Sequence, residues 1–382
     1  MHLLRARLSL HKLPKWETTV RRLAPLAGTV RGPNAVPLRS GQARSFSQQP
    51  SPTTLLLGRS PLPFQAHPPT LSRRPSRISP YSTTVTTPPS PTQEPTIHPV
   101  FEPTTCTYQY VVADPATQTA VIIDPVLDYD QCTRTVTTST ADSLIALVRG
   151  QGYCVSHVLE THAHADHLTA AFYLQRRFAE LQEGARPKVG IGKRIGKAQQ
   201  LFAGRYGVGK AEYEGVFDVL WEDDEVFKVG ELRAKVLHLP GHTEDHVGYW
   251  IGDNVFCGDS LFHPSLGSAR CDFPGGNPHA LYRSAKKLLS LEDHVRIWTG
   301  HDYPVEGKRA PAPWSTVADH KEKNVHLRHG ISEEEFVAMR MGRDRRLAAP
   351  RLIHESLQVN IRAGHVPKEL RVPVQVQAPL LL

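Results

Sequence analysis

The sequence predicts an α/β fold for roughly residues 98–365, and three observations support this prediction. Short β-branched or apolar runs of strand length recur along this part of the chain. Segments with apolar residues at helical spacing lie between several of them. His or Asp residues stand directly after a number of the runs. The pattern therefore indicates a protein whose strand ends deliver polar side chains to one common site.

The individual elements follow from these periodicities. Residues 114–117 (Asp-Pro-Ala-Thr) separate two β-rich runs and predict a hairpin turn. The helix expected over 166–182 places Asp166 near its N-terminus, where a carboxylate meets the positive end of the helix dipole. Strands are expected at 108–113, 119–124, 155–160, 226–229, 232–239, 247–251, 255–257 and 295–298, and further helices at 142–149, 279–289, 316–329 and 333–348.

A dense cluster of metal-binding residue types follows the expected strand at 155–160. His162, His164, Asp166 and His167 fall within six positions, in a His-x-His-x-Asp-His pattern. Neutral imidazoles and carboxylates suit zinc, iron or manganese, and no thiolate stands among them. With twenty histidines in the chain, a chance cluster is the alternative interpretation.

Three later positions argue against chance. His242 follows Gly241, Asp259 follows Gly258, and His301 follows Gly300, each after a β-branched or apolar run. Each of these residues is therefore expected to close the same site from the end of a different strand.

These ordered motifs resemble those of the metallo-β-lactamase superfamily over residues 98–365. The resemblance implies a four-layer αββα sandwich, with two mixed β-sheets flanked by helices and the metals at one edge. In two-metal members, the matching positions divide into two sets with a shared carboxylate. Here the first set is His162, His164 and His242, the second is Asp166, His167 and His301, and Asp259 lies between them.

Other segments resemble the persulfide dioxygenase branch of that superfamily: Glu160-Thr161-His162, His301-Asp302-Tyr303 and Gly267 to Phe273. This resemblance implies one Fe2+ per chain, bound by His162, His242 and Asp259 as a facial triad. The remaining motif residues, with Asp302, would form a second metal site or support the ligands. The implied reaction is the oxidation of glutathione persulfide with O2 and water to sulfite and glutathione, in hydrogen sulfide detoxification.

Two residues are candidates for binding the substrate. Glutathione carries two carboxylates, which a guanidinium binds through two parallel hydrogen bonds, so Arg270 on a Gly- and Ser-containing loop is the first candidate. Tyr303 is the second, because its phenol can donate a hydrogen bond. The alternatives are a local ion pair between Arg270 and Asp272, and for Asp302 a turn-capping role.

Two other functions stay open. One is a glyoxalase II-type thioester hydrolase with a dinuclear Zn2+ site, although Ala163 and Ala165 stand where that family usually has a third His in the motif. The other is a non-catalytic persulfide-binding module, which the filled set of seven ligand positions disfavours. The sequence leaves the oligomeric state open, with a homodimer as one expectation.

Residues 1–97 differ in composition from the rest of the chain. Thirteen Lys and Arg stand there against Glu17 and Glu94, while the whole chain has a net charge of +8. The excess positive charge thus lies before the catalytic domain, and nucleic-acid binding by the body is not expected. Residues 1–47 resemble a mitochondrial transit peptide, the Pro-rich residues 48–97 are expected to be disordered, and residues 366–382 form a tail. We expect a mitochondrial matrix protein with no membrane span and no disulfide framework.

Overall fold

The computed structural model describes residues 94–304 and 309–371. The predicted transit peptide (1–47), most of the predicted disordered segment (48–97) and residues 372–382 of the predicted tail lie outside the described residues. The first strand begins at Thr96, two residues before the predicted start of the catalytic domain. Within the described part of the chain, no helix is long and apolar enough to cross a membrane.

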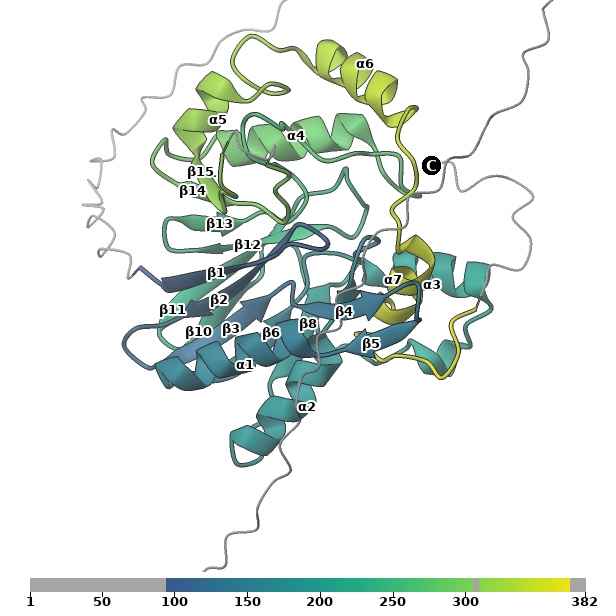
Figure 1. Cartoon of the computed structure of the whole chain (residues 1–382). Helices are drawn as coiled ribbons and strands as arrows, with labels where there is room; N and C mark the ends of the chain where they lie inside the picture. Colours follow the sequence, from purple (N-terminus) through teal and green to yellow (C-terminus); the bar gives the residue numbers. More distant parts are fainter. Residues whose placement is uncertain (1–93, 305–308, 372–382) are drawn as a thin grey trace, which may run out of the picture. The chain divides into compact units, whose positions relative to one another are not determined.

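Two six-stranded mixed sheets form the centre of the described body (Figure 1). The first sheet has the order β1-β2-β3-β6-β8-β9, antiparallel from β1 to β3 and parallel from β3 to β9. Its strands are β1 (Thr96–Glu102), β2 (Thr107–Ala113), β3 (Thr119–Ile123), β6 (Cys154–Leu159), β8 (Lys188–Gly192) and β9 (Val219–Trp221).

The second sheet has the order β10-β11-β12-β13-β14-β15, in which only β13 and β14 run parallel to each other. Its strands are β10 (Val226–Val229), β11 (Leu232–His238), β12 (Val247–Ile251), β13 (Asn254–Phe256), β14 (Arg296–Trp298) and β15 (Trp314–Thr316). A small third sheet contains β4 (Val126–Asp130), β5 (Thr135–Thr137) and β7 (Leu168–Thr169).

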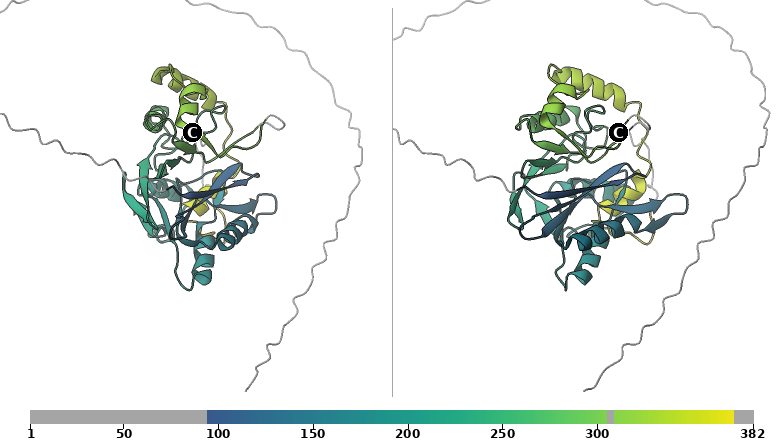
Figure 2. Two further views of the ribbon diagram at one scale, coloured as in Figure 1. Left: turned by 90° about the vertical axis from the view of Figure 1, so that its left-hand side faces the viewer. Right: turned by 60° about the vertical axis from the view of Figure 1, so that its left-hand side comes forward.

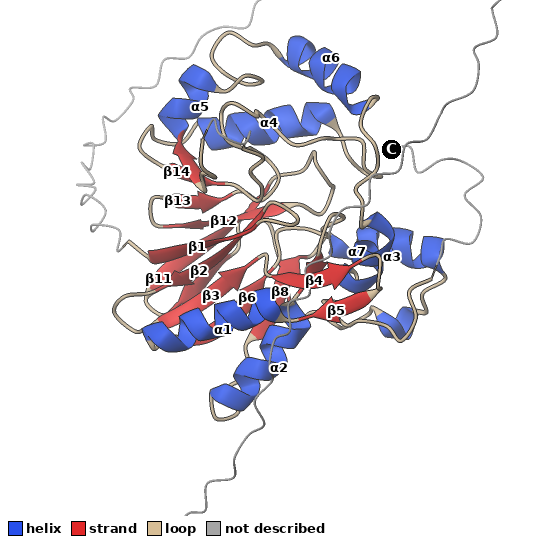
Figure 3. Cartoon of the chain, viewed as in Figure 1, coloured by secondary structure: helices blue, strands red, loops and turns tan. Residues whose placement is uncertain are grey.

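Helices cover the outer faces of both sheets, as Figures 1 and 3 show. α1 and α2 lie against the first sheet, α4 and α5 lie against the second, and α6 packs on the outer side of α4, while α3 and α7 lie beside the small sheet. The two further views agree with this layering (Figure 2). The helices are α1 (Ser139–Gln151), α2 (Ala171–Leu181), α3 (Ile195–Tyr206), α4 (Pro278–Leu289), α5 (Val317–Lys323), α6 (Glu333–Asp344) and α7 (Ile353–Asn360), with a short 3-10 helix at Lys210–Glu212.

Three buried layers of apolar side chains hold these elements together. Leu144 and Phe178 pack from the helices onto the first sheet, Tyr249 and its neighbours fill the space between the sheets, and Leu281 and Phe336 pack onto the second sheet. Alternating side chains of each strand point to opposite faces, so both sheets bury apolar residues on two sides. The predicted αββα sandwich is therefore confirmed.

The helix predicted over 166–182 begins later than expected, at Ala171. Leu168 and Thr169 pair instead with β4, and the main-chain N–H of Thr169 donates to Asn360 on α7 at 2.9 Å. Asp166 therefore stands five residues before the helix, and the helix dipole does not act on it. The predicted helix at 316–329 is likewise shorter and ends at Lys323.

Candidate metal centre and substrate pocket

Strand ends from both sheets meet at one edge of the sandwich. Asp124 follows β3, residues 160–167 follow β6, and His242, Asp259 and His301 follow β11, β13 and β14. Within each of the parallel pairs β3–β6 and β13–β14, both strands end at the same edge of their sheet. This topology explains how residues far apart in sequence converge.

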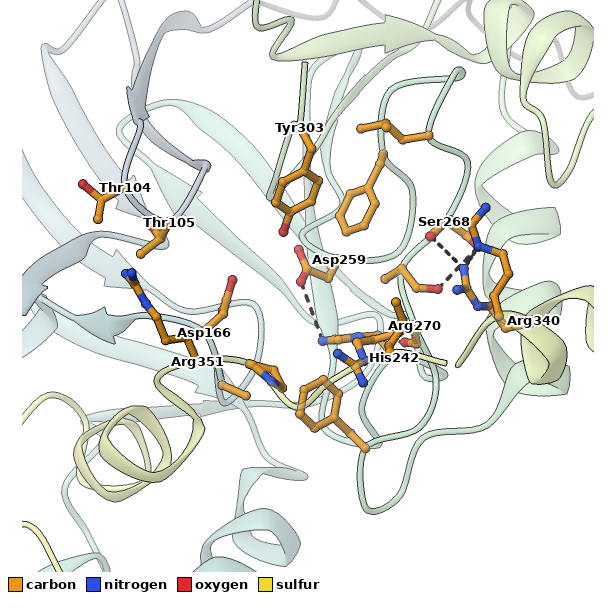
Figure 4. Close-up of a pocket in the computed structure, with 18 residues that line it drawn as sticks. Thr104, Thr105, Asp166, His242, Asp259, Ser268, Arg270, Tyr303, Arg340 and Arg351 are labelled. Atoms are coloured by element: carbon orange, nitrogen blue, oxygen red, sulfur yellow. Dashed lines mark hydrogen bonds and ion pairs between the residues drawn. The ribbon is translucent and has the colours of Figure 1, made fainter. Parts of the chain in front are cut away.

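Three of the predicted ligands form one compact group. Ligand atoms of His162, His242 and Asp259 all lie within 4.8 Å of one another, and all three side chains are buried. The Oδ2 atom of Asp259 lies 4.0 Å from His162 Nε2 and 3.6 Å from His242 Nε2. Figure 4 shows His242 and Asp259 side by side at the pocket floor.

Hydrogen bonds fix which ring nitrogen of each histidine faces the centre. The main-chain carbonyl of Arg270 accepts from His242 Nδ1 at 2.8 Å, so His242 Nε2 carries the free lone pair. His162 Nδ1 lies 2.9 Å from the hydroxyl of Thr161, which itself donates to Asp124. Burial holds the pKa of His162 well below its usual range, so this imidazole is neutral. Such oriented, neutral rings are the form in which histidine binds metal.

His301 and Asp166 border this group. His301 Nε2 lies 2.9 Å from Asp166 Oδ2 and 3.6 Å from Asp259 Oδ2, while its Nδ1 faces the Cys106 carbonyl at 3.2 Å. Burial opposes protonation of His301, but the neighbouring carboxylates outweigh it and raise its pKa to about 9. A metal bound through this Nε2 would have to displace a proton.

His164 and His167 occupy the side of the site nearer the first sheet. His164 Nε2 lies 3.0 Å from Asp124 and 3.2 Å from Glu160, which leaves its buried Nδ1 without a hydrogen-bond partner. Both ring nitrogens of His167 are buried and, among the described residues, form no hydrogen bond, although Asp166 Oδ1 lies 3.4 Å from Nδ1. His164, Asp166 and His167 form a second group with ligand atoms within 4.8 Å.

The buried His and Asp side chains at this site offer the donor atoms that a metal ion requires. His162 Nε2 and Asp259 Oδ1 are buried without a hydrogen-bond partner, as are the nitrogens of His164 and His167 just described. Each buried polar atom left unpaired costs about 1–3 kcal/mol, and coordination to a metal would satisfy several at once. The fold and these His/Asp groups together imply a metal cofactor. Among the described residues, Cys257 belongs to neither group, and its buried thiol faces the main-chain carbonyls of Gly258 and Leu261.

Three residues that hold the ligand loops in place were not predicted from the sequence. The side-chain amide of Asn360, on α7, donates to the main-chain carbonyls of His164 and His167, at 2.8 Å each. His246 Nε2 accepts from the main-chain N–H of Asp259 at 2.9 Å, and Asp245 accepts from that of Ala163 at 2.8 Å. All three are buried and hold the ligand loops in place.

A pocket of about 480 Å³ opens directly onto His242, Asp166 and Asp259. Its walls are mainly apolar, and four arginines and Tyr303 add polar groups. The apolar residues are Ala165, Phe262, Leu266, Ala269, Phe273, Leu347 and Pro350, and the arginines are Arg270, Arg340, Arg343 and Arg351. A pocket of this size and character suits a small organic molecule.

The predicted substrate-binding residues lie at this pocket with different surroundings. Tyr303 lines it and stacks on His301 with ring centroids 5.8 Å apart. Arg270 also lines it, but its guanidinium forms two hydrogen bonds with Asp272, at 2.6 and 2.7 Å, and a third with the Ala348 carbonyl. The local ion pair considered from the sequence is therefore present.

Asp302 is fully buried, and its carboxylate binds Arg309 and Ala312, which follow Tyr303 in the chain. Both of its carboxylate oxygens accept from the guanidinium of Arg309, and one also accepts from the main-chain N–H of Ala312. This arrangement matches the turn-capping interpretation, because the carboxylate ties residues 309–312 to the end of the metal-binding loop.

Comparison with known proteins agrees with this architecture. A model of the metallo-β-lactamase superfamily matches residues 107–301, which include all seven predicted ligand positions. The chain belongs to the metallo-β-lactamase superfamily.

Two relatives carry names of the hydrolase kind. A "Beta-lactamase hydrolase-like protein" of Xylella fastidiosa is 43% identical over 277 residues, which cover 72% of this chain and 62% of that protein. The chain thus matches less than two thirds of that relative's length. A "Glyoxylase B2" of Dictyostelium discoideum is 39% identical, covering 68% of this chain and 88% of that protein.

Two others point to the persulfide dioxygenase branch. The human "Persulfide dioxygenase ETHE1, mitochondrial" is 29% identical over 268 residues, covering 69% of this chain and 87% of that protein. The crystal structure of ETHE1 from Myxococcus xanthus covers 71% of this chain and all of its own, with a TM-score of 0.55 and 30% identity. The resemblance to that branch noted from the motifs is confirmed.

Proposed function

We propose that this superfamily member is an iron-dependent persulfide dioxygenase that converts glutathione persulfide, O2 and water to sulfite and glutathione. The terminal sulfur is oxidised, O2 is reduced, the S–S bond breaks, and the carrier leaves as a thiol. The observation that carries the proposal is the compact group of His162, His242 and Asp259, two of which, His242 and Asp259, line the pocket. Two imidazoles and one carboxylate are the donor set of non-haem iron oxygenases.

His164 argues against a first metal set of the hydrolase type. Within the described residues, His164 does not belong to the group that contains His162 and His242. Its Nε2 faces Asp124 and Glu160, and the ring is grouped with Asp166 and His167 rather than with His162 and His242. Asp259 takes the third place beside His162 and His242 instead.

The residues around the pocket have distinct roles in this proposal. His162, His242 and Asp259 would hold Fe2+, which when bound would supply a common site for O2 and the persulfide sulfur. The rings of Phe262 and Phe273 exclude water from the floor. The Tyr303 phenol points toward Asp259 (Figure 4), where it can donate a hydrogen bond to the substrate.

A second candidate function is the hydrolysis of glutathione thioesters at a dinuclear Zn2+ site. The group of His164, Asp166 and His167, with both nitrogens of His167 unpaired, offers donors for a second ion. The relative named as a glyoxylase also favours it. Two such ions would generate a hydroxide nucleophile near neutral pH.

Metal analysis and two assays separate the candidates. We expect protein purified without oxygen to contain about one iron per chain, to consume O2 with glutathione persulfide, and to hydrolyse lactoylglutathione weakly or not at all. Two zinc ions per chain with strong thioesterase activity and no O2 uptake would support the hydrolase instead. Persulfide binding without turnover under both assays would identify a non-catalytic module.

We also propose that the protein acts in the mitochondrial matrix, because the basic, acid-poor composition of residues 1–47 is typical of transit peptides. Mass spectrometry of organellar protein should find the mature N-terminus between Phe46 and Pro99. An intact Met1 in that material would contradict this location.

A further inference from the structure

The four arginines of the pocket differ in whether their charge is already neutralised. Arg270 is paired with Asp272 through two hydrogen bonds. Arg340 is buried and paired with Asp344, whose other oxygen accepts from the main-chain N–H of Cys271. These two arginines therefore hold the pocket walls together and have little charge left for a ligand.

Arg343 and Arg351 are in a different position. Both line the pocket and both are exposed. Within residues 94–304 and 309–371, neither guanidinium has a carboxylate within 4.0 Å, and neither donates a hydrogen bond to another described residue. Main-chain hydrogen bonds lower the pKa of the exposed Asp130, and the charge of Arg351 adds to this effect, but the two side chains form no ion pair. Toward the described part of the chain, both guanidinium groups thus keep their donors available.

These two residues approach the centre from different elements. Arg343 follows Arg340 by three residues on α6, so both lie on the same helix face. Arg351 stands just before α7, on the side of Thr105 and Asp166, whereas Arg340 lies on the opposite side of the pocket (Figure 4). Two positive charges therefore flank the metal centre from separate directions.

The charge balance leaves the pocket mouth positive. Asp166 and Asp259 face the centre, where histidines and a bound cation would neutralise them. The pairs of Arg270 with Asp272 and of Arg340 with Asp344 are neutral overall. The charges that remain are those of Arg343 and Arg351, above walls that are mainly apolar.

We propose that Arg343 and Arg351 bind the anionic groups of the thiol carrier and thereby select a carrier with two separated carboxylates. This inference rests on the proposed function only for the chemical nature of the carrier. Glutathione fits because its carboxylates lie at opposite ends of the molecule, with the sulfur between them. A guanidinium binds a carboxylate through two parallel hydrogen bonds, and the apolar walls accommodate the middle of the peptide.

Binding of a non-reactive analogue tests the inference without turnover. Titration calorimetry with S-methylglutathione compares the metal-loaded wild-type protein with Arg343→Gln, Arg351→Gln and the double variant. We expect each single change to weaken binding about five- to tenfold at low salt, because one charge-assisted contact is lost. The difference should shrink as salt increases, because exposed charges are screened.

Neighbouring arginines outside the pocket provide matched controls. Arg345→Gln and Arg346→Gln remove the same charge from exposed positions two or three residues beyond Arg343. Binding should be unchanged in both. Equal affinities in the wild type and the Arg343 and Arg351 variants, or equal losses in the controls, would overturn the inference.

The activity toward persulfides of different thiol carriers is a second measurement. Glutathione persulfide carries two carboxylates, whereas the persulfides of glutathione diethyl ester and of cysteamine carry none. The double variant should lose kcat/KM only for glutathione persulfide, and the wild type should prefer that substrate over the diethyl ester. Binding that depends on the two arginines, without O2 uptake, would support this inference and reject the dioxygenase function. O2 uptake with binding that does not depend on them would support the dioxygenase function and reject this inference.

Discussion

His242 Nδ1 donates a hydrogen bond to the main-chain carbonyl of Arg270 at 2.8 Å, which ties a metal-facing imidazole to the loop that forms the pocket wall. The position of the ring therefore depends on the position of that loop. The Arg270 side chain fixes the loop in turn, through Asp272 and the Ala348 carbonyl.

Replacement of Arg270 should consequently act on stability rather than on substrate binding. Arg270→Ala leaves the mostly buried Asp272 carboxylate without its ion-pair partner, which should lower the free energy of unfolding by about 1–3 kcal/mol. Asp272→Ala removes the same pair and should give a similar loss in thermal or urea unfolding. A raised KM in Arg270→Ala with unchanged stability, and no such change in Asp272→Ala, would instead assign Arg270 to the substrate.

The metal ligands predict a contrast between two variants. Asp259→Ala should remove bound metal and activity, because its carboxylate lies beside both His162 and His242. His301→Ala should keep about one iron per chain in the proposed mononuclear site, since His301 lies outside that group. Elemental analysis of protein prepared without oxygen measures both. Loss of half the metal in His301→Ala, from two ions to one, would indicate a dinuclear centre.

The ion pair between the buried Asp302 and the partly exposed Arg309 offers a test by double-mutant cycle. Arg309→Met leaves the fully buried carboxylate without its ion-pair partner, although the Ala312 N–H still donates to it, so it should be destabilising by about 3 kcal/mol. The double variant Asp302→Asn with Arg309→Met should be less destabilised than the sum of the single variants, because no buried charge remains. Urea unfolding measures all three. Additive losses would show that the two side chains do not act as a pair.

The convergence of the candidate ligands could be predicted because each stands shortly after a strand. His162, His242, Asp259 and His301 lie at turns that close strands, and parallel pairing brings such turns to one edge. Strands with long apolar runs were predicted close to their observed positions. Strands of two or three residues, such as β7 and β9, leave too short a pattern to recognise.

The supporting residues could not be predicted because their partners are distant in sequence. Asn360 holds the loop of His164 across 196 positions, and no local pattern marks a buried amide of this kind. The same holds for Arg343 and Arg351, which reach the pocket through the path of the chain between α6 and α7. In the sequence, those arginines are indistinguishable from exposed neighbours such as Arg345.

Gly300 precedes the ligand His301 and allows close contact between two ligand loops. Its main-chain N–H donates to the Gly258 carbonyl at 2.9 Å. A Cβ at this position would lie 2.4 Å from Asp259 Oδ1 and 3.0 Å from the carbonyl carbon of Gly258. The first distance is too short for a Cβ contact, and the second requires the main chain to give by a few tenths of an ångström. Gly300→Ala should therefore displace the Asp259 carboxylate and weaken metal binding about tenfold or more, since supporting contacts of metal ligands commonly have effects of that size.

Gly196→Ala is the matched control for this substitution. Gly196 lies in α3, and a Cβ there meets no atom within 4 Å. Alanine is favoured over glycine within a helix by about 0.5–1 kcal/mol, so this variant should be as stable as the wild type or slightly more so and bind metal normally. Competition with a chelator measures the affinity, and thermal unfolding measures the stability of each variant. Undiminished metal affinity in Gly300→Ala would mean that the Asp259 side chain can move aside without loss, and that the close packing of the two loops does not position this ligand.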